Sequence, residues 1–386
     1  MTAGAAPAQV STAVQWLVIE PLDTVTVRDG RAFDAGQRSL AGGTQPAPST
    51  VAGAVAQVVR GDPRQVHGPL VVRRAPDGGQ WEPLFPIPAD VVRARDEMSC
   101  SLLEPTAAPA AGRERTAPLT DLPAGMTTLS GDGGPVSGWW TAATLHTYLT
   151  DRSALRESLR DDRFGRAEDA PWAPERRVGL ARTGDRTAQD GLLYSAEQLR
   201  PRYRAGFAAR CLDIPLPPAG SATAASTTAL APTGRATVRF GGEGRRAEVH
   251  RLTPNECASL APPTAPADFP DGRVLLYLAT PALFADGWRP GPGPFRPGVR
   301  LIAAATGSRV ISTARPDHAL GAVGGARLLW AAAAGSVYFL QADSSADAAA
   351  FARGCHDQLL TAGSPFPQID DRLVTAGFGL ALIGRW

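Results

Sequence analysis

The sequence contains no lysine: all 39 of its basic residues are arginine among 386 residues. This absence excludes a Walker A phosphate loop, a Schiff-base lysine and a catalytic lysine. Arginine presents a planar, permanently charged fork that matches phosphate oxygens. Because 37 carboxylates reduce the formal net charge to +2, the placement of the arginines carries more information than their number.

Cysteine and histidine are scarce and dispersed. The four cysteines form no C-x-x-C pair, and the five histidines show no ligand spacing. This pattern indicates neither a disulfide framework nor a zinc site, so we expect no metal and no cofactor. His356 and Asp357 form an isolated dyad that we interpret as a pair on a helix surface.

Long apolar runs are missing. The longest, around 274–285 and 328–340, fall short of the roughly 20 residues that a membrane-spanning helix needs. The first ten residues lack the basic flank and apolar core of an export signal. We therefore expect a cytoplasmic protein without membrane contact.

Strand and helix patterns are interleaved along the whole chain, which predicts an α+β fold. Strands are expected at 15–22, 70–74 and 85–92, and Glu175 to Arg200 alternates like two strands that a third, over 203–210, would extend. Ser49 or Thr50 is a candidate helix cap, before valines at 51, 55 and 58 on one helical face. Further expected elements are a hairpin over 327–340 and a helix near Asp347.

Two composition shifts suggest how the chain is divided. From about Arg95 to Ser137 the sequence has little periodicity, which indicates a long insertion or mobile arm. A stretch over 215–232 resembles a linker. These features predict a first domain over 1–214 with an insertion at about 95–137, and a second domain over 215–386.

The densest basic stretch is 176–210, where eight arginines accompany three carboxylates. Guanidinium forks on strands suit phosphate oxygens, and Tyr194 and Tyr203 are placed to stack on bases, as in single-stranded RNA binding. A solvated sheet face is the alternative. The candidate RNA-binding residues here are Arg176, Arg177, Arg182, Arg186 and Tyr194.

Glycine-rich segments supply further candidates. Gly241, Gly242 and Gly244, followed by Arg245 and Arg246, let a backbone approach a polyanion closely; a plain hairpin turn is the alternative. In Gly377-Phe378-Gly379 the aromatic ring either stacks on a base or fills the core. Near the N-terminus, Arg28, Asp29, Gly30 and Arg31 form a tight turn that is more basic than a turn requires.

Motifs of catalysis are absent from the sequence. It contains no G-x-S-x-G elbow, no H-E-x-x-H and no recognisable cysteine-histidine pair. We therefore expect no catalytic residues and favour a binding role.

The segments WLVIEPLDTVTVRDGRAF, PAPSTVAGAV, FPIPADVV, RRVGLARTGDRTAQDGLLYS, FGGEGRR, AGSVYFL and GFG occur in an order that resembles one family. It is the RAMP-superfamily subunit of the type III-B CRISPR Cmr effector complex that binds the 5′ handle of the CRISPR RNA. The resemblance runs from about Trp16 to Trp386. Val27 and Ala32 stand where the family commonly has an aromatic residue and a proline, so stacking at that point is in doubt.

The resemblance implies two ferredoxin-like (RRM-like, RAMP) modules with a thumb-like insertion and glycine-rich loops. It implies a non-catalytic anchor for the handle, between the large polymerase/cyclase-like subunit and a RAMP backbone subunit. It also adds Ser49, Thr50 and Gly53 to the candidate RNA-binding residues, since a helix N-terminus suits a phosphate. On the 176–194 stretch it adds Thr183 and Thr187.

Two other functions remain open. Relatives in the same superfamily cleave CRISPR repeat RNA without a metal, and His250 is the candidate general acid or base for that chemistry. A plain protein adaptor is the third possibility.

Overall fold

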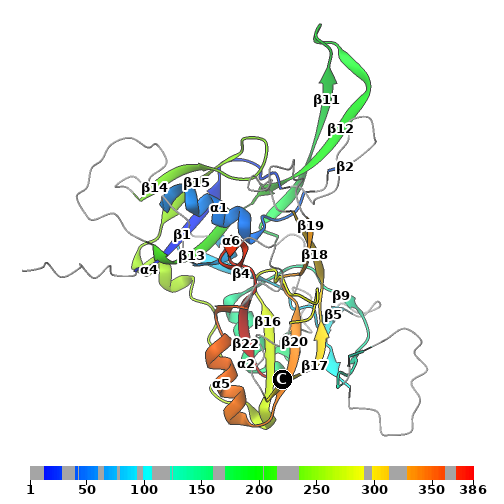
Figure 1. The fold of residues 1–386 in the computed structure, drawn as a ribbon, viewed down its shortest axis with the longest axis vertical. Coiled ribbons are helices and arrows are strands. Elements are labelled where there is room, and N and C mark those ends of the chain that lie inside the picture. Colours follow the sequence, from blue (N-terminus) through cyan, green and yellow to red (C-terminus); the bar gives the residue numbers. More distant parts are fainter. Residues whose placement is uncertain are drawn as a thin grey trace, which may run out of the picture.

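The chain folds around two antiparallel sheets that carry small satellite sheets (Figure 1). The structure is a computed structural model, and it describes residues 13–27, 40–41, 43–59, 65–75, 79–93, 99–106, 122–123, 125–159, 170–202, 204–214, 234–290, 298–312, 328–360 and 371–386. Helices and strands alternate along it, so the predicted α+β class is confirmed. The Arg28–Arg31 turn, Tyr203 and the 215–232 stretch lie outside the described residues.

The first sheet has seven strands, all antiparallel to their neighbours. β1 and β3 both pair with β13, so they run parallel to each other with α1 as their connection. This arrangement is a split β-α-β unit. The order is β10 (Trp139–Thr141), β4 (Trp81–Pro86), β3 (Gln65–Arg74), β13 (Gly206–Ile214), β1 (Ala13–Pro21), β15 (Arg246–Arg251) and β14 (Arg235–Arg239).

Helix α1 (Pro48–Val59) covers one face of the first sheet. Val51, Val55 and Val58 are buried against the sheet, which confirms the predicted helical face. The helix begins at Pro48, earlier than the predicted cap, because proline suits the first helical position, where no N–H partner is needed. Ser49 and Thr50 therefore lie in the first turn.

The opposite face of the first sheet shares a core with the second sheet. Trp16 and Val18 of β1 belong to the same buried cluster as Leu275 and Tyr277 of β16. Helix α2 (Ala142–Thr150) adds Leu145, Tyr148 and Leu149 to this cluster, and α3 (Arg152–Ser158) follows it.

The second sheet contains another split β-α-β unit. β20 and β22 both pair antiparallel with β16 and are linked through α5 (Ser345–Cys355), which is the helix predicted near Asp347. The strand order is β17 (Val299–Ala305), β20 (Val337–Ala342), β16 (Arg273–Leu278), β22 (Leu380–Gly384) and β21 (Gln358–Leu359).

The change from one sheet to the other does not fall at residue 214. β15 pairs with β1 and β14 pairs with β15, so 235–251 completes the first sheet. The second sheet begins with β16 at Arg273, after α4 (Pro254–Ser259) and the short helix η2 (Pro270–Gly272). The boundary expected at 214/215 therefore lies inside the first sheet rather than between the sheets.

A long hairpin projects from the molecule at the upper right of Figure 1. It consists of β11 (Trp172–Arg182) and β12 (Ala188–Pro201), which confirms the predicted strand pair, and β2 (Leu40–Ala41) pairs with β12 at its base. The expected extension by 203–210 is wrong. β13 instead lies in the first sheet, paired with both β1 and β3, and its neighbouring residues Ala208 and Ala209 are buried in the clusters on opposite faces of that sheet.

The stretch expected as an arm at 95–137 is partly core. β6 (Cys100–Leu102) pairs with β5 (Val91–Arg93), and Cys100 and Leu102 are buried in the cluster shared by the two sheets. Three two-residue strands, β7 (Glu104–Pro105), β8 (Leu129–Ser130) and β9 (Gly134–Pro135), also fall in this stretch. Residues 107–121 lie outside the described residues.

The predicted hairpin over 327–340 does not form. β19 (Leu328–Ala332) pairs with β18 (Ser308–Ser312), whereas β20 belongs to the second sheet. Gly335, at φ +89°, sits between the two strands, where a β-carbon would lie 2.9 Å from the carbonyl oxygen of Ile87. Contact with the first sheet therefore redirects the chain. The short helix α6 (Asp371–Val374) precedes β22.

Candidate nucleic-acid interface

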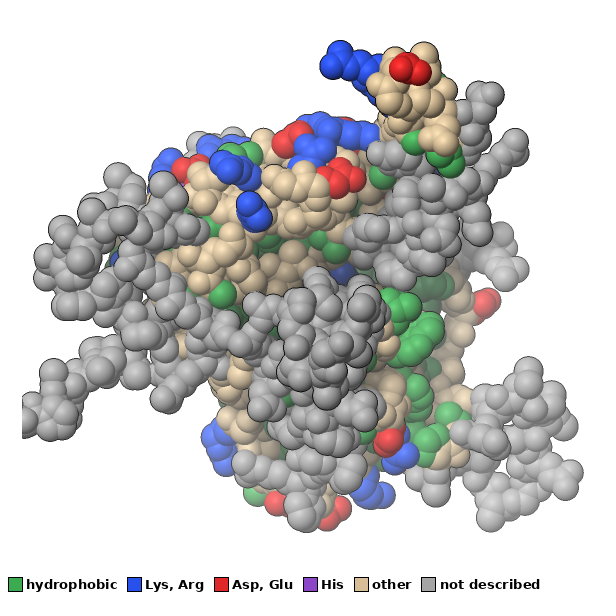
Figure 2. Space-filling view, turned by 45° about the horizontal axis from the view of Figure 1, so that its top comes forward, with side chains coloured by type: hydrophobic (Ala, Val, Ile, Leu, Met, Phe, Trp, Pro, Cys, Tyr) green, Lys and Arg blue, Asp and Glu red, His purple; other side chains and the backbone are tan. Residues whose placement is uncertain are grey.

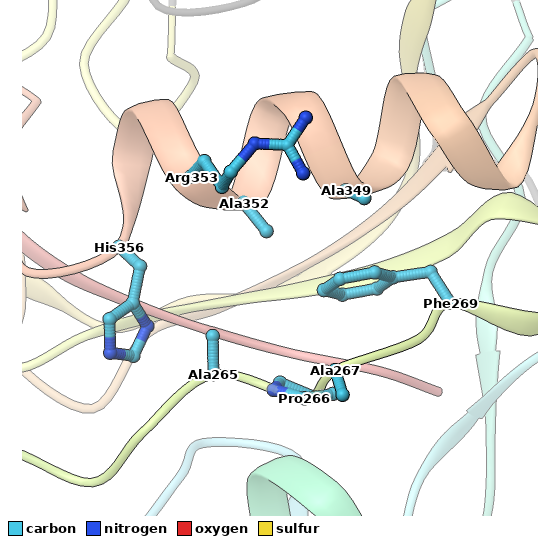
Figure 3. A pocket seen from close by; sticks show the side chains of 8 residues that line it. All are labelled: Ala265, Pro266, Ala267, Phe269, Ala349, Ala352, Arg353 and His356. Atoms are coloured by element: carbon cyan, nitrogen blue, oxygen red, sulfur yellow. The ribbon is translucent and has the colours of Figure 1, made fainter.

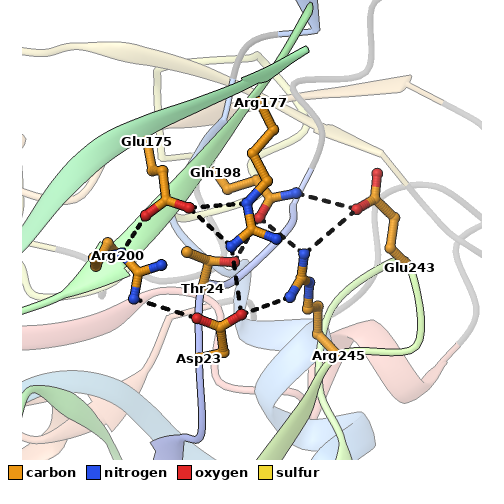
Figure 4. A network of polar contacts seen from close by, with 8 residues as sticks. All are labelled: Asp23, Thr24, Glu175, Arg177, Gln198, Arg200, Glu243 and Arg245. Atoms are coloured by element: carbon orange, nitrogen blue, oxygen red, sulfur yellow. Dashed lines mark hydrogen bonds and ion pairs between the residues drawn. The ribbon is translucent and has the colours of Figure 1, made fainter. Parts of the chain in front are cut away.

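A polar network joins the base of the β11–β12 hairpin to the turn between β14 and β15 (Figure 4). It combines three arginines with three carboxylates and two neutral side chains, and it brings together three segments that are far apart in sequence. We call it the arginine network. Its members are Asp23, Thr24, Glu175, Arg177, Gln198, Arg200, Glu243 and Arg245.

Asp23 lies at the centre of the arginine network. Its carboxylate is 2.7 Å from Arg245 Nη1, 3.2 Å from Arg200 Nη1 and 3.4 Å from Arg177 Nη2. Partial burial raises the pKa of Asp23, but the backbone N–H of Thr24 and the three guanidinium groups outweigh burial and hold this pKa below its usual value. The carboxylate therefore stays charged and fixes three cations on one surface.

Glu175 provides a second anchor on the hairpin. Its carboxylate accepts hydrogen bonds from Arg200 Nε and, at 2.8 Å, from Arg177 Nε. These two bonds lower the pKa of Glu175 to about 2. Because the carboxylates are as numerous as the guanidinium groups, the arginine network is electrically balanced, and phosphate groups must compete with its carboxylates.

The glycine-rich turn is tied to the segment that follows β1. The N–H of Gly242 donates to the carbonyl of Thr26 at 2.7 Å, and a β-carbon at Gly241 would lie 2.7 Å from the same oxygen. The turn is therefore a tight hairpin end, and the Gly242 amide is occupied. Gly244, at φ +69°, faces open space, and the side chain of Arg245 enters the arginine network.

The other face of the hairpin carries unpaired arginines. Arg176 and Arg182 are exposed on the face that also exposes Val178 and Leu180. Within the described chain these two arginines have no carboxylate partner. The predicted basic stretch is thus divided between two faces of one hairpin.

At the hairpin tip, Thr183 and Thr187 close the turn. Their hydroxyl oxygens are 2.7 Å apart, and the N–H of Thr183 donates to the carbonyl of Thr187. Arg186 is exposed at φ +61°, with its N–H donating to Thr183. The backbone of Tyr194 lies in β12, opposite Gly179.

Two arginines of the predicted stretch belong elsewhere. Arg204 pairs with Glu20 on β1, at 3.1 Å. Arg210 is mostly buried and pairs with Asp357 near the second sheet, at 2.6 Å. The eight arginines of 176–210 therefore do not form one continuous surface.

The start of α1 lies where the two halves of the chain meet. Arg309 of β18 donates to the carbonyl of Gln45, and burial lowers the pKa of Arg309 to about 10. Ser49 and Thr50 are half-buried there, and the N–H of Thr50 donates to the carbonyl of Ala47. Gly53 is exposed, and a β-carbon there would meet no neighbouring atom.

The Gly377-Phe378-Gly379 segment is part of the core. Phe378 is fully buried with Ala47, Ile311 and Ala331, so its ring fills the core and is not an exposed stacking surface. Gly377, at φ +99°, lies against β3, where a β-carbon would overlap the carbonyl oxygen of Gly68.

The surface view shows arginine side chains in several places along the upper part of the molecule, with carboxylates among them, and further arginine side chains near its lower end (Figure 2). This mixture agrees with the balanced charges of the arginine network. Among the described residues, no cluster of three or more His, Cys, Asp or Glu side chains could hold a metal ion, and no helix is long and apolar enough to cross a membrane.

A pocket of about 400 Å³ lies between α5 and the segment before η2 (Figure 3). Alanine, proline and Phe269 form most of its wall, with Arg353 and His356 as its polar side chains. His356 Nδ1 accepts a hydrogen bond from the N–H of Ile383, and burial lowers the pKa of His356. The wall does not supply the convergent polar groups of a catalytic site.

Sequence reasoning found Arg177 and Arg245 but missed the other network residues, which are Asp23, Thr24, Glu175, Gln198, Arg200 and Glu243. Asp23 and Gln198 are ordinary polar residues in strand-like segments, so neither has a local signal. Arg200 belongs to the predicted basic stretch, but its register opposite Ala173 becomes visible only with the strand pairing.

These features define a class of protein: a two-sheet α+β protein with two split β-α-β units and an arginine-bearing hairpin. The model of the CRISPR-associated protein family Cas_Cmr3 matches residues 17–386. The chain therefore belongs to the Cas_Cmr3 family, which confirms the resemblance found in its motifs. Comparison with curated proteins finds no match.

Solved structures include similar chains. One belongs to the cryo-EM structure of the Type III-B Cmr-beta bound to cognate target RNA, with a TM-score of 0.45 and 14% identity. Another belongs to that assembly with target RNA and AMPPnP, state 1, with a TM-score of 0.47 and 16% identity. Each alignment covers 84% of this chain and 86% of the other.

Proposed function

We propose that this chain is a non-catalytic subunit of a type III-B Cmr effector complex that anchors the 5′ handle of the CRISPR RNA. In that role it bridges the large polymerase/cyclase-like subunit and a RAMP backbone subunit. Membership of the Cas_Cmr3 family supports the complex. The observation that carries the RNA role is the gathering of arginines on the β11–β12 hairpin, with Arg177 and Arg200 beside Arg245 on one face and the exposed Arg176 and Arg182, unpaired within the described chain, on the other.

The fold supports two ferredoxin-like modules. Each large sheet contains a split β-α-β unit, α1 with β1 and β3 in one and α5 with β20 and β22 in the other, as the ferredoxin-like motif requires. The projecting β11–β12 hairpin is our candidate for the thumb. The 95–137 stretch, expected as a long insertion or mobile arm, is not our candidate for the thumb, because part of it is core.

Repeat cleavage receives little support. His250 is 7% exposed, and its Nε2 lies 3.5 Å from Glu20 and 3.4 Å from Glu248. A general acid or base must come within hydrogen-bond reach of the reacting hydroxyl. In this conformation, carboxylates rather than solvent surround the ring.

Footprinting of the handle tests the anchoring role. Arg176, Arg182 and Arg186 are exposed and have no described carboxylate partner, so replacing all three by glutamine should leave the fold intact. We expect the triple variant to lose protection of the handle. Its RNA binding should also depend less on salt, since binding with fewer phosphate contacts releases fewer counterions.

A matched control separates this effect from net charge. Arg289, Arg300 and Arg353 are exposed on the second half of the chain, and replacing them by glutamine removes the same charge. We expect this control to protect the handle like the wild type. Equal protection by both triple variants would contradict the placement of the handle on the hairpin.

A further inference from the structure

A second pair of arginines lies beside the glycine-rich turn, outside the arginine network. Arg239 on β14 and Arg246 on β15 are directly opposite each other in the antiparallel register, and both are exposed. Side chains that are directly opposite across two antiparallel strands share one face and are near neighbours. The two guanidinium groups therefore project from one small area of the surface.

The backbone around Arg239 brings the two side chains closer still. The N–H of Arg239 donates to Gln57 Oε1, and its carbonyl accepts from Gln57 Nε2, each at 3.0 Å. Both backbone groups thus point away from β15, so Arg239 and Arg246 form a non-hydrogen-bonded pair, the arrangement with the shorter Cα separation. The side-chain amide of Gln57, on α1, thus bonds to the outward-facing backbone groups of edge strand β14, as a neighbouring strand would. These two bonds fix the position of Arg239.

Charge makes this arrangement unfavourable in the free protein. Like charges directly opposite each other destabilise a sheet. In the described residues neither side chain has a carboxylate partner. Arg235, four residues before Arg239 on the same face, does have one, because its Nη1 lies 3.6 Å from Glu248.

An anion between the two guanidinium groups would turn the repulsion into attraction. Phosphate accepts forked hydrogen bonds from more than one arginine. The neighbouring glycine-rich turn leaves room for the sugar-phosphate backbone of an RNA, since Gly244 faces open space. We propose that Arg239 and Arg246 bind one phosphate group of the RNA between them, an inference that rests on the proposed function and adds Arg239 to the RNA-binding residues.

The experiment compares Arg239→Gln with Arg235→Gln in the full-length chain. The two variants lose the same charge, from the same face of the same strand. RNA that carries the handle is titrated at several salt concentrations, and thermal unfolding of the free protein is followed in parallel. We expect Arg239→Gln to weaken binding about tenfold and to reduce the slope of log affinity against log salt by about 0.7.

The thermal stability of the free protein should rise in Arg239→Gln, although its RNA affinity falls. Removing one of two like charges should raise the melting temperature of Arg239→Gln by about 1–2 °C, whereas Arg235→Gln should leave it unchanged or lower it. Gln57→Leu should also weaken binding, and it should have no further effect when Arg239 is already glutamine. This non-additivity would identify Gln57 as a positioning residue.

Two results would contradict the inference. They are equal RNA binding by the two arginine variants and a lower melting temperature for Arg239→Gln. Failure of the wild-type chain to bind any RNA would instead overturn the proposed function itself.

Discussion

Arg210 and Asp357 form an ion pair between the two large sheets, with 2.6 Å between Nη1 and Oδ2. Arg210 belongs to β13 of the first sheet, and Asp357 follows α5 of the second half. Nη2 of Arg210 also donates to His67 Nδ1 at 2.7 Å. Of the dyad His356-Asp357, expected on a helix surface, Asp357 therefore joins the two sheets, whereas His356 lies beside β22 within the second half.

Asp357→Asn should lower the free energy of unfolding at pH 7 by about 1.5–3 kcal/mol, the range for hydrogen bonds to charged groups. Asparagine keeps the positive φ of 59° that Asp357 adopts, so the change removes the charge and preserves the turn. Denaturant unfolding measures the difference. Asp132→Asn, at an exposed position, is the control and should stay within about 0.5 kcal/mol of the wild type.

The effect of Asp357→Asn should depend on pH. Burial raises the pKa of Asp357, but the neighbouring His67 and the Arg210 guanidinium outweigh burial and hold this pKa below its usual value. The stabilisation is therefore fully present above pH 3.8 and is lost as the pH falls through the lowered value. The two proteins should converge in strong acid, and a constant difference down to pH 2 would exclude the ion pair as its source.

Gly377→Ala should destabilise the protein by about 2–4 kcal/mol, because the new β-carbon combines a left-handed backbone with overlap of the Gly68 carbonyl. Gly244→Ala is the matched control. Its φ is also positive, but the space is open, so its cost should be only about 1 kcal/mol. If chemical denaturation gave the same loss of unfolding free energy for both variants, the close contact of Gly377 with β3 would contribute nothing to the cost of the substitution.

Local patterns predicted the elements that depend on local chemistry. The period of Val51, Val55 and Val58 gave α1, and the alternation after Glu175 gave β11 and β12, since these signals arise within one element. The same patterns do not show which strands will pair. We therefore predicted β13 beside the hairpin and β19 beside β20. In the structure β13 lies in the first sheet, and β19 pairs with β18.

The candidate site was predictable in residue type but not in arrangement. The sequence pointed to Arg177 and Arg245, yet it could not show that Asp23 and Glu175 hold them. Phe378 had two readings, and only the packing of Ala47 and Ile311 around it decides between them. Long-range contacts determine whether a charged or aromatic side chain is free, and they leave no periodic trace in the chain.

The Glu175 carboxyl should titrate near pH 2, because Arg200 and Arg177 donate hydrogen bonds to its charged form. The stabilisation of the hairpin base by this group is present above pH 4.5 and is lost as the pH falls toward 2. Carbon-detected NMR of labelled glutamate follows the titration. In Arg200→Gln the Glu175 pKa should move back toward 4.5, and an unchanged value would mean that the two side chains do not pair in solution.

Asp23→Asn tests whether the arginine network binds RNA or only holds the hairpin. Removing the central carboxylate leaves three guanidinium groups less compensated, so RNA that carries the handle should bind more tightly and with a steeper salt dependence. The same change should lower the melting temperature, because Asp23 links the hairpin to the β14–β15 turn. Tighter binding together with lower stability requires the arginines to face the RNA, since a purely structural network would lose stability without gaining affinity. Asp132→Asn, which makes the same change in net charge at an exposed site, should leave both quantities nearly unchanged.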